Sequence, residues 1–180
     1  MRQGMRESGR TARRARAGSA KDAIALLKAD HRQVEAWFGQ CKKSKSAGRK
    51  KSLAEKICKA LEVHMRIEEE IFYPAFLGAT QDLDMHHEAE VEHAGAKRLV
   101  AELEALSPEN EYFDAKVKVL SEMIKHHVKE EEKPGGMFAE ARKSHLDLDD
   151  LGHRLAQRKK ELESSGNGGP AGMPRSLLDA

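Results

Sequence analysis

Two short segments of the sequence place a histidine and a glutamate four residues apart, a spacing that suits metal ligation. His64 and Glu68 lie in HMRIE, and His127 and Glu131 lie in HVKEE. On an α-helix such residues share one face, about 6 Å apart along the axis, so both side chains can approach one cation. Imidazole nitrogen and carboxylate oxygen are common ligands of first-row divalent metals. The two segments therefore predict a metal site.

Two further histidines, His31 and His93, complete an internal repeat. The spacing from His31 to His64 is nearly that from His93 to His127, and both His31 and His93 follow an acidic residue. Such a repeat predicts two similar helical hairpins. With short connections, the four helices would run up, down, up and down around one core.

Apolar residues recur at steps of three and four along four segments, which predicts four long amphipathic helices. We expect these helices at about 19–43, 52–75, 81–106 and from Ser107 and Pro108 to about 133, with shorter helical pieces at 137–163. Ser19 is a plausible N-cap of the first helix, and Pro74 marks the place where the second stops or kinks. Each of the four apolar stripes contains one of the candidate histidines.

The composition agrees with an all-α fold, because charged residues make up 34% of the chain and aromatic residues only 4%. We predict an up-down-up-down four-helix bundle at 19–155, preceded by a flexible basic arm at 1–18. Residues 156–180 are predicted to form a helical end and a disordered tail. Cys41 and Cys58 fall at positions predicted to be buried, where a free thiol acts as a small hydrophobe.

A histidine on an apolar stripe is more often a hydrogen-bonded core residue than a ligand. Glu68 and Glu131 argue against that reading, because an unpaired ionised glutamate inside a bundle costs several kcal/mol. No lysine or arginine occupies the matching stripes. Metal cations would compensate these charges.

Six protein ligands exceed the four of a structural zinc, and two carboxylates suit a bridged pair of metals about 3.5 to 4 Å apart. The predicted ligands are His31, His64, Glu68, His93, His127 and Glu131. Nitrogen and oxygen ligands without thiolate favour two iron ions, with manganese or zinc as alternatives.

Other histidines and glutamates leave alternatives open. His127 is preferred to His126, which lies about 100° around the helix from the apolar stripe. Glu90 or His86 could complete the coordination of the metal, or could contact a metal-ligating side chain from outside. Alternatively, the segment that contains them could be a solvated helix start. We expect the remaining polar candidates to lie on solvated faces: Glu69, Glu70, Glu130, Glu132, His145 and His153.

The segments HMRIEEEIFYP at 64–74, EAEVEHAGAKRL at 88–99 and HHVKEEE at 126–132, together with the Asp-His pair at 30–31, resemble the hemerythrin-like HHE cation-binding family. The resemblance covers about residues 20–155. It implies a bundle around a carboxylate-bridged diiron centre, with the four histidines as terminal ligands and the two glutamates as bridges.

One departure from oxygen-carrying hemerythrins concerns the third helix. These proteins have a second histidine one turn from the third-helix ligand, whereas Ala89 and Lys97 stand four residues from His93. Reversible oxygen carriage is therefore in doubt, and one coordination position is left open or filled by Glu90. The cysteine-bearing N-terminal segment of iron-centre repair proteins is also missing, since no cysteine precedes Cys41.

These observations predict a cytoplasmic diiron-binding protein that binds, senses or buffers O2, peroxide or nitric oxide. The alternative is an enzyme that consumes peroxide or performs another redox reaction at the same centre; no catalytic acid-base pair is visible. No apolar stretch is long enough for a membrane span or a signal-peptide core. Six arginines within the first sixteen residues could contact nucleic acid, but a solubilising arm is the preferred reading.

Overall fold

The structure is a computed structural model that describes residues 22–165. Its elements are α1 (Ala23–Lys43), α2 (Ala47–Ile67), the π-helical turn η1 (Glu68–Phe72), α3 (Tyr73–Thr80), α4 (Leu83–Glu104), α5 (Phe113–Glu132), α6 (Met137–Lys143) and α7 (Leu148–Ser165). No strand occurs between residues 22 and 165, so the predicted all-α class is confirmed. None of the helices in this range is long and apolar enough to cross a membrane.

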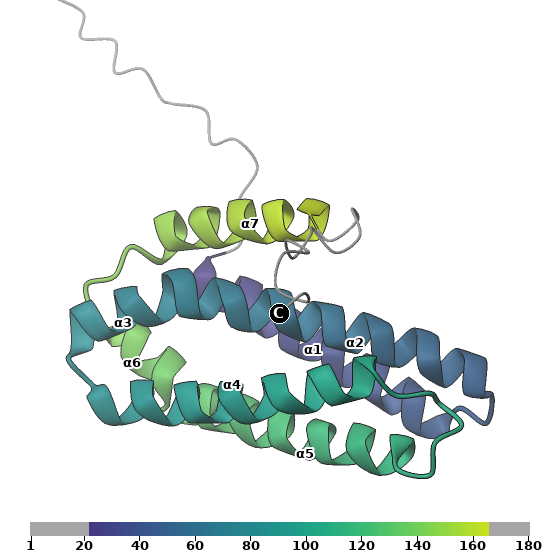
Figure 1. Cartoon of the computed structure of the whole chain (residues 1–180). Coiled ribbons are helices and arrows are strands. Elements are labelled where there is room, and N and C mark those ends of the chain that lie inside the picture. Colours follow the sequence, from purple (N-terminus) through teal and green to yellow (C-terminus); the bar gives the residue numbers. More distant parts are fainter. Residues whose placement is uncertain (1–21, 166–180) are drawn as a thin grey trace, which may run out of the picture.

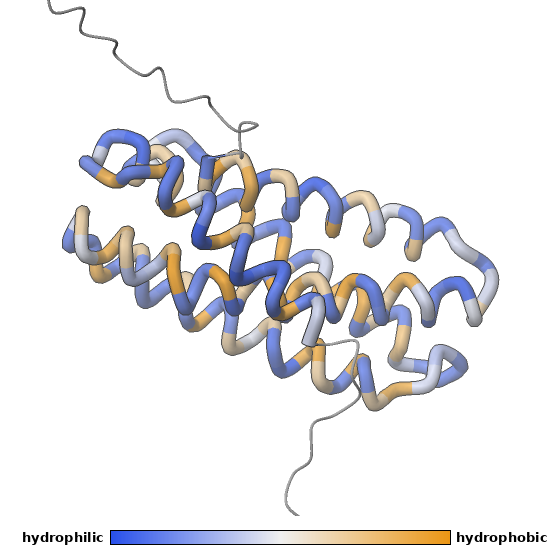
Figure 2. The backbone as a smooth tube through the Cα atoms, turned by 90° about the horizontal axis from the view of Figure 1, so that it is seen from above, coloured by the Kyte–Doolittle hydropathy of each residue, from blue (hydrophilic) through white to orange (hydrophobic). Residues whose placement is uncertain are grey.

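Four long helical segments lie side by side and form the predicted bundle (Figure 1). They are α1, the continuous run of α2, η1 and α3, then α4 and α5. Helix α7 lies along α1 and α2, and α6 lies near α3 at one end of the bundle (Figure 1). Hydrophobic and hydrophilic positions alternate along each helix, as amphipathic helices of a bundle require (Figure 2).

Side-chain caps set the first two helix starts. Asp22 caps α1 and accepts a hydrogen bond from the backbone N–H of Ala25 at 2.8 Å. The proposed cap Ser19 lies outside the described residues. Ser46 caps α2, which therefore begins at Ala47 and not near residue 52. The first turn of α2 is polar, so apolar periodicity gave no sign of it.

The start of α5 also differs from the prediction. Ser107 and Pro108 do not open the helix, because the segment that follows them forms turns. The N–H of Asn110 donates to the carbonyl of Ser107 and that of Phe113 donates to Asn110, each three residues back. The regular helix begins only at Phe113. At the other end of the chain, α7 runs as one helix across the predicted boundary at residue 155.

Pro74 neither ends nor sharply breaks the second long helix, which continues to Thr80. Proline lacks an N–H, and its ring would clash with the carbonyl four residues earlier, that of Glu70, in a regular α-helix. The chain accommodates it by widening into η1 directly before it. There the N–H of Tyr73 donates to the carbonyl of Glu68, five residues back. This turn brings Tyr73 towards the side of the helix on which Glu68 lies.

The apolar core consists of two clusters at opposite ends of the bundle. One cluster lies towards the α1–α2 and α4–α5 connections and includes Phe38, Ile57, Leu61, Val100, Phe113 and Leu120. The other includes Ile24, Phe72, Phe76, Phe138, Leu151 and Leu155 and takes in α6 and α7. Cys41 and Cys58 are free and buried, as predicted. The buried polar side chains lie between these two clusters.

Candidate metal centre

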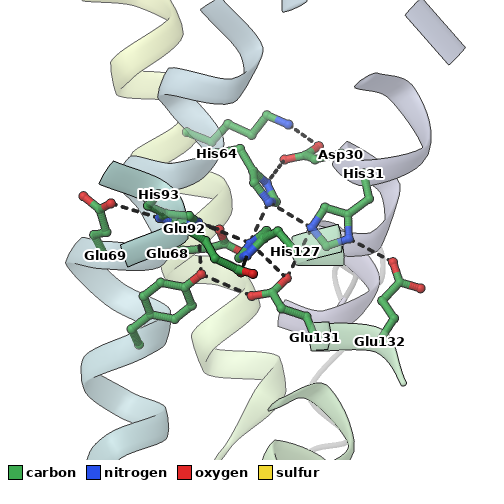
Figure 3. A network of polar contacts seen from close by, with 12 residues as sticks. Asp30, His31, His64, Glu68, Glu69, Glu92, His93, His127, Glu131 and Glu132 are labelled. Carbon is green, nitrogen blue, oxygen red and sulfur yellow. Dashed lines mark hydrogen bonds and ion pairs between the residues drawn. The ribbon is translucent and has the colours of Figure 1, made fainter. Parts of the chain in front are cut away.

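Six polar side chains form a layer across the middle of the bundle (Figure 3). They are His31 of α1, His64 of α2, Glu68 of η1, His93 of α4, and His127 and Glu131 of α5. Their exposed fractions lie between 0% and 5%. The structure thus brings together in the core all six residues that the sequence predicted as ligands.

Glu68 reaches both pairs of histidines. The Nε2 atoms of His31 and His64 are 3.0 Å apart, and those of His93 and His127 are 3.3 Å apart. Oxygen Oε1 of Glu68 lies 3.3 Å from His64 Nε2, and Oε2 lies 3.4 Å from His93 Nε2. Each pair, together with Glu68, could hold one metal ion.

Glu131 spans the same two pairs from α5. Its Oε2 lies 3.4 Å from His31 Nε2 and 3.7 Å from His127 Nε2. Two half-sites, each with two imidazoles, therefore share two carboxylates. A carboxylate that reaches both half-sites has the placement of a bridging ligand.

A second layer of carboxylates lies behind the histidines. Glu132 accepts a hydrogen bond from His31 Nδ1 at 2.9 Å, and Glu69 accepts one from His93 Nδ1 at 2.9 Å. The prediction that Glu69 and Glu132 lie on solvated faces is therefore wrong. Each follows a core glutamate by one residue, and the next position along a helix turns only about 100°, which leaves a long side chain within reach of the adjacent helix.

The other two histidines have the same kind of partner. Glu92 accepts a hydrogen bond from His127 Nδ1 at 2.8 Å, and Asp30 lies 3.6 Å from His64 Nδ1. These carboxylates directly precede His93 and His31 in the sequence. The acidic-His pairs of the internal repeat thus mark residues that orient the histidine of the neighbouring helix, as outer carboxylates commonly do around metal sites.

This arrangement leaves a set of lone pairs that face one another. A carboxylate only accepts, so the hydrogen-bonded Nδ1 atoms of His31, His93 and His127 carry a proton, and in the neutral form of each ring Nε2 presents a lone pair. Both oxygens of Glu68 and Oε2 of Glu131 are buried without a hydrogen-bond partner. Buried acceptors that point at one another need protons or cations between them. The donor set therefore fits metal ions.

The pKa values of the buried groups are shifted in both directions. Burial lowers the pKa of His31 to about 4, and the charge of His64 adds to this shift. Burial also lowers that of His64, but Glu68 and Asp30 outweigh it and raise the pKa to about 10. Burial raises the pKa of Glu131 to about 7, helped by the charge of Glu68. In the metal-free layer a proton on His64 thus compensates Glu68, and a bound cation would take the place of that proton.

Tyr73 contributes a hydroxyl that the sequence did not reveal. It donates to Glu131 Oε1 at 3.2 Å and lies 3.1 Å from His93 Nε2. Burial raises its pKa well above the ordinary value, and the charges of Glu68 and Glu131 add to the shift. Regular helical periodicity places position 73 off the stripe of Glu68, and only the π-turn brings it to the centre.

Glu90 does not reach the six residues, because its side chain is 53% exposed and lies 3.6 Å from His86 Nδ1. Tyr73 is the additional residue at the centre, and the ring of His86 packs edge-on against it. His126 is 61% exposed, whereas His127 is buried, as the apolar stripe predicted.

The remaining polar candidates lie on the surface, as predicted. His145 and His153 are exposed. Glu70 pairs with Arg66 and Arg158, and Glu130 pairs with Lys133. Of the four glutamates predicted to face solvent, Glu70 is exposed, and Glu130 is partly exposed and does not contact the six core residues.

Cations outside the bundle core hold the outer carboxylates in place. Lys97 pairs with Glu69 at 2.5 Å, and Arg32 pairs with Glu132. Asp30 is paired with Lys159 of α7. Burial raises the pKa of Asp30, but His64 and Lys159 together lower it below the ordinary value. The last helix thus reaches the centre through Lys159, Asp30 and His64.

The fold and the polar layer define an all-helical, cation-binding bundle. The hemerythrin HHE cation binding domain family matches residues 22–134. The chain belongs to this family, and the resemblance of its motifs is confirmed. Helices α6 and α7 follow the matched region.

Two known proteins resemble the chain. The crystal structure of a hemerythrin HHE cation binding domain-containing protein from Mycobacterium kansasii superposes with a TM-score of 0.67 and 22% identity, covering 82% of this chain and 90% of that one. A protein of Nostoc sp. named DNA nickase is 27% identical over 110 residues, which are 59% of this chain. The match spans only 30% of the Nostoc protein.

We predict that Lys159→Met weakens retention of the bound cation. Without the ammonium group, Asp30 is more easily protonated and holds His64 less firmly, since outer residues tune the affinity of the ligands that they orient. The measurement is metal per chain after dialysis against increasing chelator concentrations. Lys160→Met is the matched control, because Lys160 is exposed one position further along α7. Equal metal loss in the two variants would contradict the role of Lys159.

Proposed function

We propose that this protein is a cytoplasmic diiron protein that binds, senses or buffers a small oxidant or gas: O2, peroxide or nitric oxide. The observation that carries the proposal is the reach of Glu68 to both histidine pairs inside a buried layer. The ligands would be His31, His64, Glu68, His93, His127 and Glu131. Two shared carboxylates and four imidazoles favour a pair of irons over a single structural zinc.

The donor types support iron further. Nitrogen and oxygen atoms without a thiolate suit iron, and manganese or zinc would fit the same atoms with availability deciding among them. When bound, two irons would supply exchangeable electrons and a coordination position for the small ligand. The outer carboxylates fix the ring orientations, and the two apolar clusters exclude water from both ends of the layer.

Tyr73 supplies the protein's own hydrogen bond at this centre. Its hydroxyl is held by Glu131 on one side and lies close to His93 on the other. With its pKa raised, the phenol stays protonated at neutral pH and can donate. An enzyme that consumes peroxide would use the same centre, and the rate of peroxide loss with purified protein separates turnover from simple binding.

We predict that protein purified from an iron-replete host holds about two irons per chain and shows oxo-bridged ferric absorption in the near-ultraviolet. Removal of the metal should lower the melting temperature, because ligands from four helices couple binding to folding. Metal analysis, absorption spectra and thermal melts provide the readouts. One zinc per chain without these bands would refute the dinuclear assignment.

The register of α5 gives a second prediction. His127→Ala should lose iron and lower the melting temperature, because it opens a coordination position and leaves Glu131 less compensated in the core. His126→Ala should keep nearly all the iron, since this exposed ring pairs with the outer carboxylate Glu92, at 3.2 Å, and lies outside the buried layer. Iron-to-protein ratios in the reverse order would show that the ligand assignment on α5 is wrong.

Contact with DNA is a second candidate function, favoured by the name of the Nostoc relative and by six arginines in the first sixteen residues of this chain. Arginines neutralise phosphates without a defined fold. The residues concerned lie outside the described range.

The arm can be tested by comparing the full chain with a variant that lacks residues 1–18. If the arm binds DNA, the full chain should retard duplex DNA at low salt and release it as salt rises, because phosphate contacts are salt-dependent. A supercoiled plasmid incubated with the iron-loaded protein reports nicking. Equal retardation by both chains would assign any binding to the bundle and not to the arm.

A further inference from the structure

A hollow between α4 and α5 leads from the surface to the buried layer. It has a volume of about 40 Å³, and about 10–15 Å³ is enough for one water molecule. Its inner end is formed by His127 and Glu131, two of the six core residues. Three further carboxylates and one ammonium group line its walls: Glu88, Glu92, Glu130 and Lys133. The hollow is therefore acidic.

Three side chains that can ligate a metal gather at the outer end of this hollow. Ligand atoms of Glu88, Glu92 and His126 all lie within 4.8 Å of one another. Glu88 and His126 are exposed, and Glu92 is partly buried. Their carboxylate oxygens and imidazole nitrogen can bind one divalent cation together. We call these three residues the mouth cluster.

Glu92 connects the mouth cluster to the buried layer. Its Oε1 lies 3.2 Å from Nε2 of His126, and its Oε2 accepts a hydrogen bond from Nδ1 of His127 at 2.8 Å. At the inner end of the hollow, Oε2 of Glu131 has no hydrogen-bond partner among the described residues, and this side chain is only 3% exposed. A cation that leaves the mouth cluster inward therefore meets a buried carboxylate whose charge it compensates.

We propose that the mouth cluster is a second, surface site for a divalent cation, and that this cation passes from it through the α4–α5 hollow into the buried layer. The proposal rests on the metal-binding function proposed above, and it assigns a role to residues outside the six ligands. A bare ion inside a bundle is costly. The carboxylates along the walls replace the water that the ion gives up, so they reduce this cost.

The seam between α1 and α5 does not suit a cation. Two hollows of about 410 and 220 Å³ lie along it, and basic side chains outnumber acidic ones in the lining of both. Such linings repel an approaching cation, whereas an acidic cleft raises its local concentration. In the α4–α5 hollow, the ammonium group of Lys133 is paired with Glu130. Glu88 and Glu92 therefore remain for the incoming ion.

Glu88 is the residue with which to test the mouth cluster. It is exposed on α4 and lies outside the six residues of the layer, and Glu88→Gln removes its charge while keeping its shape. Glu90→Gln is the matched control. Glu90 is also exposed on α4, but it belongs to a different cluster, with His86 and His87.

The first experiment locates the surface site without iron. Manganese(II) is added in small amounts to zinc-loaded protein, because manganese does not displace the more tightly bound zinc from the layer. Its unpaired electrons broaden the NMR signals of nearby side chains. The ring signals of His126 should broaden before those of His87. Glu88→Gln should need several-fold more manganese for this effect, and Glu90→Gln should not. Earlier broadening of His87, or an equal manganese requirement in the two variants, would overturn the proposal.

The second experiment measures how fast metal enters. The metal-free full chain is mixed with cobalt(II) in a stopped-flow instrument, and the visible absorption of cobalt reports its binding to nitrogen and oxygen ligands. Glu88→Gln and His126→Ala should take up cobalt several-fold more slowly than Glu90→Gln, with equal cobalt per chain at the end. Added salt should slow uptake by the wild type, because it screens the acidic mouth. Equal uptake rates in the three variants would overturn the route.

The route and the diiron function fail in different ways. A wild-type chain that holds two irons, combined with mouth variants that take up cobalt at the wild-type rate, would overturn the route and leave the diiron function intact. A chain that binds manganese beside His126 but retains no iron would refute the diiron function and leave the surface site standing.

Discussion

Two carboxylates that face four imidazoles in a buried layer impose the main physical constraint on this bundle. Glu68 is fully buried and Glu131 nearly so, and both oxygens of Glu68 and one oxygen of Glu131 lack a hydrogen-bond partner. Leaving such groups uncompensated would cost several kcal/mol per charge, a large fraction of the stability of an ordinary domain. The apolar clusters at both ends supply the stability that lets the layer exist. Cations of the kind that the family binds would neutralise the facing carboxylates and so remove this cost.

The constraint extends outward through successive shells of opposite charge. Each histidine has an outer carboxylate beside Nδ1, and Asp30, Glu69 and Glu132 each meet a lysine or arginine nearer the surface. Orientation of the rings is therefore fixed by polar contacts that do not depend on the metal. Such preorganisation reduces the reordering that metal binding requires. Helix α7 takes part in it, although it follows the segment matched by the family.

The sequence predicted the bundle and the six residues of the layer because helical periodicity and the internal repeat both point to them. It failed where the backbone leaves that periodicity. The π-turn at η1 arises from the missing N–H of Pro74, and it moves Tyr73 onto a face that regular geometry assigns elsewhere. Glu69 and Glu132 looked solvated because a helix pattern shows which residues face the core. The pattern does not show which flanking side chains reach the next helix.

The two hairpins repeat each other closely, but the repeat ends at the position of Tyr73. The register that aligns Glu68 with Glu131 aligns Tyr73 with Gly136, where a side chain would collide with the backbone carbonyl of Glu130. The hydroxyl therefore has no counterpart in the second hairpin. On the opposite side, the ring of Phe138 stacks on His31 at 5.8 Å. The near two-fold symmetry of the six polar side chains is thereby broken, so the two half-sites differ, and a single cation bound there would have a preferred side.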